Sequence, residues 1–121
     1  MNHFLLILLS VFWGNSFSQP QKIVFTEEQK IDYLLACIEE LTDAKFIRNG
    51  VSHQAYEAAN HLRMKRKKAG QFVKTVDDFI KKVASNSSIS GNPYKIIYND
   101  GKIIEVRLFF YECLKKLEEA P

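Results

Sequence analysis

The chain has 121 residues and a formal net charge of +3, from 17 Lys and Arg residues against 14 Asp and Glu residues. That length fits one domain with a single core, and so mild a charge does not indicate nucleic-acid binding. Three histidines and two widely separated cysteines give no metal-binding spacing, and no glycine-rich phosphate loop is present, so we expect neither a metal nor a cofactor.

Residues 1–18 are predicted to be a secretory signal peptide. The apolar run at residues 4–13 is shorter than the about 20 residues that span a bilayer. Ser16 and Ser18 are the small residues that signal peptidase requires before a cut between Ser18 and Gln19. The alternative, a buried N-terminal helix, fits less well because Pro20 and the polar residues before it end the run. We expect a soluble product in the periplasm or outside the cell, away from chromosomal DNA.

One globular domain is predicted over residues 26–121, after a short extended segment at residues 19–25. Its first helix is expected at about residues 27–42, where a capping-box sequence precedes apolar residues at helical spacing. A short extended piece then leads into Asn49-Gly50, a turn signal because both residues tolerate positive φ. Ser52 is expected to cap a second helix, which runs from His53 to about residue 69.

The second half of the domain is predicted to hold two more helices and a hairpin. Thr75 can cap a third helix, and the Ser- and Asn-rich residues 85–93 form a loop. Two apolar strands, at residues 94–98 and 102–106, flank a three-residue hairpin loop that ends in Gly101. A last helix follows at about residues 107–119. The fold class is therefore α+β, mainly α: three helices, then a β-hairpin and a C-terminal helix packed around one small core.

Four segments of the domain carry a family resemblance: FIRNG at residues 46–50, HLRMK at 61–65, TVDDFI at 75–80, and ASNSSISGNPY at 84–94. Together they resemble a family of small exported bacterial proteins described as a domain of unknown function, with periplasmic-type members in E. coli. The resemblance covers about residues 28–98. It implies a bacterial source and a periplasmic or secreted location, and it brings no activity, cofactor or partner.

Candidate binding residues are the polar residues at turns, at helix ends and in the serine loop: Arg48, Asn49, His61, Arg63, Lys65, Ser85, Ser87, Ser88, Ser90, Gly91 and Tyr94. Arg48 at a turn suits a carboxylate or phosphate. The alternative is structural, with Arg48 paired to Asp77 or Asp78 and Asn49 making the turn.

The second predicted helix has a basic C-terminal half. His61, Lys65 and Lys68 share one face of it, and Arg63 shares another with Lys67. Such a half-helix can bind an anionic lipid, a polyanion or an acidic protein. It can equally be a solvated face that complements the helix dipole, with His61 as a hydrogen-bonding residue at the edge of the core.

The serine loop has three interpretations. Its N–H groups and hydroxyls, around Ser87 to Gly91, can form an anion-binding nest. One serine can act as a nucleophile with His61 as base and Arg48 at the oxyanion, although the sequence has no G-x-S-x-G motif. In the third interpretation, the hydroxyls cap the third helix and fix the loop.

Cys37 and Cys113 lie on the apolar faces of the first and last predicted helices. Export permits a disulfide between them, and two buried free thiols are the alternative. For the whole protein, our leading hypothesis is a non-enzymatic binding domain with an anion-favouring polar surface. A small envelope hydrolase that uses His61 and a loop serine, and a structural or assembly protein, are the alternatives.

Overall fold

The computed structural model describes residues 23–120, so the predicted signal peptide and its cleavage site lie outside the described residues. The helices are α2 (Glu27–Glu39), α3 (Ala55–Ala69), the one-turn η1 (Gly70–Phe72), α4 (Val76–Asp78), its π-helical continuation η2 (Phe79–Ala84), and α5 (Val106–Glu119). The strands are β1 (Lys45–Arg48), β2 (Val51–His53), β3 (Lys95–Ile97) and β4 (Ile103–Glu105). The predicted class, α+β and mainly α, is confirmed.

The four strands form one antiparallel sheet in the order β2-β1-β3-β4. Phe46 on β1 stands opposite Ile96 on β3 and His53 on β2, and both apolar side chains are buried. Because side chains alternate between the two faces of a strand, Arg48 shares the inner face with Phe46, and Tyr94 shares it with Ile96. The face that holds the core therefore ends in polar side chains.

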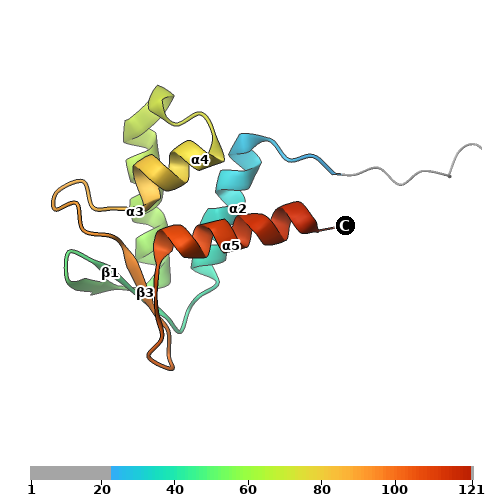
Figure 1. Ribbon diagram of the computed structural model, residues 1–121. Helices are drawn as coiled ribbons and strands as arrows, with labels where there is room; N and C mark the ends of the chain where they lie inside the picture. Colours follow the sequence, from blue (N-terminus) through green and yellow to red (C-terminus); the bar gives the residue numbers. More distant parts are fainter. Residues whose placement is uncertain (1–22, 121) are drawn as a thin grey trace, which may run out of the picture.

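The helices cover this inner face and supply most of the core. α2 buries Ile31, Leu34, Leu35 and Ile38 along one stripe, as its capping box and apolar spacing predict. The Phe79 and Phe110 rings, from η2 and α5, are both fully buried with centroids 5.8 Å apart. Figure 1 shows α5 lying across α2, while the β1–β2 hairpin and the loop before β3 extend on one side of α3. Within residues 23–120, no helix is long and apolar enough to cross a membrane.

The prediction that Ser52 caps a helix starting at His53 is wrong. Asn49 and Gly50 both adopt positive φ, 53° and 77°, which is the turn that reverses a chain into a tight hairpin. The chain therefore returns as β2 through His53, and Gln54 becomes the N-cap of α3. The glycine predicted at the left-handed position of the second hairpin is confirmed, with Gly101 at φ 89°.

Cys37 on α2 and Cys113 on α5 are free thiols in this structure. Burial, and then the neighbouring Cys37 thiol, raise the pKa of Cys113 to about 12. The packing of the first helix on the last thus brings the two cysteines into each other's neighbourhood. A disulfide between them stays a prediction.

Candidate functional site

A cleft of ≈ 600 Å³ lies between α3, the β1–β2 hairpin and the loop at residues 85–94. We call it the basic cleft. It brings together most of the polar residues singled out from the sequence with several that were not: its lining is Arg48, Asn49, Val51, His53, His61, Met64, Lys65, Lys68, Ser87, Ser88, Ile89 and Tyr94. A volume of this size is that of a small-molecule site, about 300–1,000 Å³.

Local periodicity explains why these side chains meet. On α3, His61, Lys65 and Lys68 follow one another at spacings of four and three, so they share one face. On the sheet, Arg48 and Tyr94 continue the inner face beyond Phe46 and Ile96. The cleft therefore lies next to the hydrophobic core, where polar side chains replace apolar ones along α3 and the inner face of the sheet.

Four of these residues form a hydrogen-bonded chain. Arg48 Nη1 lies 2.5 Å from His61 Nδ1, and His61 Nε2 lies 3.3 Å from the Tyr94 hydroxyl. Lys65 Nζ donates to that same hydroxyl at 3.1 Å and to the Asn86 carbonyl at 2.7 Å. The Lys65 ammonium also stands 5.0 Å from the centre of the Tyr94 ring, within the range of a cation–π contact.

The chain fixes the tautomer of His61. Since a guanidinium can only donate, His61 Nδ1 must accept from Arg48, and the imidazole proton lies on Nε2 and points to Tyr94. Burial, and then the charges of Arg48 and Lys65, lower the pKa of His61 from 6.5 to about 4. The imidazole is therefore neutral at neutral pH. The Tyr94 hydroxyl accepts two hydrogen bonds, and its own proton is free to be donated into the cleft.

The lowered pKa of His61 predicts a loss of stability in mild acid. Between the unfolded pKa of 6.5 and the folded pKa of about 4, the unfolded chain binds more protons, so stability is complete above pH 6.5 and falls as the pH drops toward 4. Because His61 is half-buried, solvent screens part of the effect, and we expect a loss of about 1 kcal/mol between pH 7.5 and 5. Urea unfolding at both pH values measures it, with His61→Gln as the non-titrating control. An equal pH dependence in the variant contradicts this assignment.

The cations of the cleft differ from the two arginines of α3, Arg63 and Arg66. Among residues 23–120, no carboxylate forms an ion pair with Arg48, Lys65 or Lys68. Arg63, by contrast, pairs with Glu39 at 2.7 Å, and Arg66 pairs with Asp32 at 3.3 Å. The two arginines of α3 are thus paired with acids of α2, whereas the cations of the cleft have no acidic partner among residues 23–120.

Two expectations from the sequence differ from the structure: the pairing of Arg48 with Asp77 or Asp78, and the place of Arg63 in the site. Asp77 pairs with Lys81, and Asp78 accepts from the backbone at the start of α4, so the alternative in which Arg48 pairs with either of these acids is wrong. Arg63 points to α2 and does not line the cleft.

The loop serines stabilise the loop. Ser85 is buried and donates to the Ile80 carbonyl at 2.6 Å, which caps the end of η2. Ser87 Oγ accepts from the N–H groups of Ile89 and Ser90, and Ser90 Oγ bonds Asn49 Oδ1 at 2.6 Å. Gly91 donates its N–H to the Ser87 carbonyl. Because these N–H groups are used within the loop, few donors are left for the predicted anion-binding nest. Ser88 is the loop serine that lines the cleft beside Ser87.

The proposed base and nucleophile do not meet. His61 uses Nδ1 for Arg48 and Nε2 for Tyr94, and no serine hydroxyl among the described residues is hydrogen-bonded to it. With the proton on Nε2, His61 has no free lone pair toward the loop. The geometry gives the hydrolase alternative no support.

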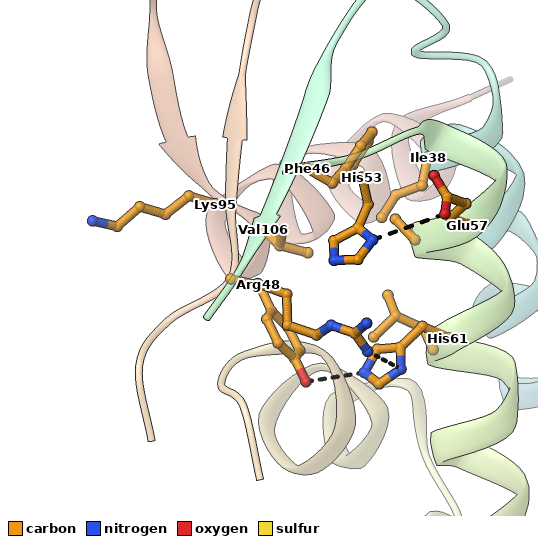
Figure 2. A pocket seen from close by; sticks show the side chains of 11 residues that line it. Ile38, Phe46, Arg48, His53, Glu57, His61, Lys95 and Val106 are labelled. Atoms are coloured by element: carbon orange, nitrogen blue, oxygen red, sulfur yellow. Dashed lines mark hydrogen bonds and ion pairs between the residues drawn. The ribbon is translucent and has the colours of Figure 1, made fainter. Parts of the chain in front are cut away.

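A small pocket, which we call the inner pocket, adjoins the basic cleft. It has a volume of ≈ 30 Å³ and shares Arg48, His53, His61 and Tyr94 with the cleft. Figure 2 shows the His53 imidazole facing this space from one side and the Arg48–His61 pair from the other, with Glu57 beside His53. The sequence did not single out His53 as a site residue, because β2 was not predicted and His53 was placed at a helix start.

A protein family and a bacterial relative match this chain. Residues 25–118 match the "Family of unknown function (DUF5329)". The "Uncharacterized protein YfeK" of Salmonella typhimurium is 43% identical over 68 residues, which cover 56% of this chain and 57% of that protein. The chain thus aligns with little more than half the length of this relative. No solved structure matches. The chain belongs to the DUF5329 family, as the resemblance of its motifs indicated.

Proposed function

We propose that this chain is an exported, non-enzymatic binding domain whose basic cleft takes up an anionic group. The observation that carries the proposal is the open positive charge: Arg48, Lys65 and Lys68 line one cleft with no acidic partner among residues 23–120. Export rests on the predicted signal peptide.

The cleft offers an anion several fixed donors. Arg48 is held by His61, and Lys65 by Tyr94 and the Asn86 carbonyl, so neither cation needs to be ordered when a ligand arrives. The Tyr94 hydroxyl adds a donor, because burial raises its pKa and it keeps its proton. Positioned donors of this kind reduce the entropy lost on binding.

Removing one cleft cation tests the proposal. Lys65→Met keeps most of the apolar stem and removes the charge, so the affinity for phosphate or sulfate should fall about tenfold. Arg63→Met, two residues along the same helix but paired with Glu39, is the matched control and should leave affinity unchanged. Isothermal calorimetry at low salt measures both. Equal losses in the two variants, or no anion binding by the unmodified protein, refute the anion site.

A further inference from the structure

His53 carries a buried polar atom without a partner. Its Nε2 is inaccessible to solvent and has no hydrogen-bond partner in the part of the chain described. Its Nδ1 lies 4.0 Å from Glu57 Oε2. Leaving a buried polar atom without a partner is unfavourable, so this one points to a group that the inner pocket receives.

The electrostatic surroundings define what that group must offer. In the neutral imidazole, the Glu57 carboxylate favours the proton on Nδ1, the nitrogen that faces it, and this leaves Nε2 as a hydrogen-bond acceptor. The missing partner is therefore a donor. A carboxylate, a sulfate or a fully ionised phosphate monoester in the cleft has only acceptor atoms, so it does not satisfy His53 by itself.

The inner pocket limits the size of the donor. Its ≈ 30 Å³ exceeds the about 10–15 Å³ that one water needs but leaves no room for a ring. Its walls are mostly apolar, with Ile38, Phe46 and Leu62 among the residues that line it. A small hydroxyl-bearing group fits the size of the pocket and the unpartnered acceptor at His53 Nε2.

The geometry points to a hydroxylated organic anion as the ligand: its carboxylate or phosphate binds at Arg48, Lys65 and Tyr94, and its hydroxyl donates to His53 Nε2. This assignment rests on the proposed anion site and adds the ligand class. Arg48 and His53 line both the cleft and the inner pocket, so the two spaces adjoin. Because His53 Nε2 is covered in the free protein, a ligand that reaches it has to shift the side chains around it.

Matched probe pairs test the ligand class. L-Lactate is propionate with an added hydroxyl group, and glycerol 3-phosphate is propyl phosphate with added hydroxyl groups. The first pair tests a carboxylate ligand and the second pair tests a phosphate ligand. We expect the hydroxylated member of at least one pair to bind about three- to tenfold more tightly. In His53→Phe, which fills the same space without an acceptor, this preference should disappear while the anion still binds. His53→Gln, which can place a carbonyl oxygen near the Nε2 position, should keep part of it.

The outcomes separate the two proposals. If all four probes bind the unmodified protein and neither pair differs, the anion site stands and the hydroxyl inference fails. A preference that survives in His53→Phe also overturns the inference, and a buried water is then the partner of His53. If no probe binds, both proposals fail. If the His53→Phe chain misfolds, His53→Gln takes its place: a hydroxyl preference that His53→Gln leaves at full strength then overturns the inference.

Discussion

Arg48→Met should weaken the binding of sulfate to the purified protein about 10- to 100-fold. A charged hydrogen bond contributes about 1.5–3 kcal/mol, which corresponds to this range of affinity. Arg48 is the central cation of the cleft, because it lines both the cleft and the inner pocket and is fixed by His61. Methionine keeps the apolar stem and removes the guanidinium, so the loss reports on charge and hydrogen bonding.

Arg48→Met should also change the pKa of His61. After burial, the charge of Arg48 is the largest cause of the low pKa of His61, so the pKa of His61 should rise above about 4 in Arg48→Met. Histidine NMR signals followed against pH measure this rise. Arg63→Met is the control, since Arg63 pairs with Glu39 away from the cleft. Unchanged sulfate affinity together with an unchanged His61 pKa contradicts the assigned role of Arg48.

Phe110→Ala should lower the free energy of unfolding by about 3–5 kcal/mol. Phe110 is fully buried on α5, and the centroid of its ring lies 5.8 Å from that of Phe79. Alanine at this position therefore leaves a cavity between α5 and η2. A small domain has only about 5–15 kcal/mol of stability, and the variant should therefore lie near the limit of folding. Urea unfolding monitored by circular dichroism measures the loss.

An exposed phenylalanine provides the matched control. Phe72 in η1 is 68% exposed, so Phe72→Ala should change stability by no more than about 0.5 kcal/mol. A similar loss in both variants contradicts the assignment of Phe110 to the core. The result bears on the cleft as well, since α3 and the sheet hold their site residues only while this core is intact.

The helices were predictable because their signals are local. The capping box at Thr26, the cap at Thr75 and the apolar spacing of α2 and α5 each lie within a few residues. The pairing of β1 with β3 was not predicted, because it joins segments about fifty residues apart and depends on tertiary packing. β2 was missed for a different reason: a strand of three residues with one half-buried side chain has little sequence pattern.

The candidate site was predictable in part, because some of its residues have a local sequence signal and the positions of others depend on tertiary packing. Arg48, His61, Lys65 and Tyr94 were singled out because an apolar core does not need polar residues at turns and helix faces, and they converge. His53 was missed because its position depends on β2. Arg63 was included because it is basic and lies near Lys65 in sequence, yet the helical period directs it to Glu39 on α2. Which cations are neutralised depends on the tertiary structure.

The most direct test of the anion site is an NMR titration of the purified protein with sulfate, whose charge is constant over the pH range of interest. Sulfate in the basic cleft should shift the signals of Arg48, His61, Lys65 and Tyr94 and raise the pKa of His61 from about 4, because a nearby anion favours the protonated imidazole. Affinity should then increase as the pH falls from neutrality toward the free protein's His61 pKa of about 4. Shifts confined to the Arg63–Arg66 face of α3, or a His61 pKa that sulfate does not move, would contradict the site.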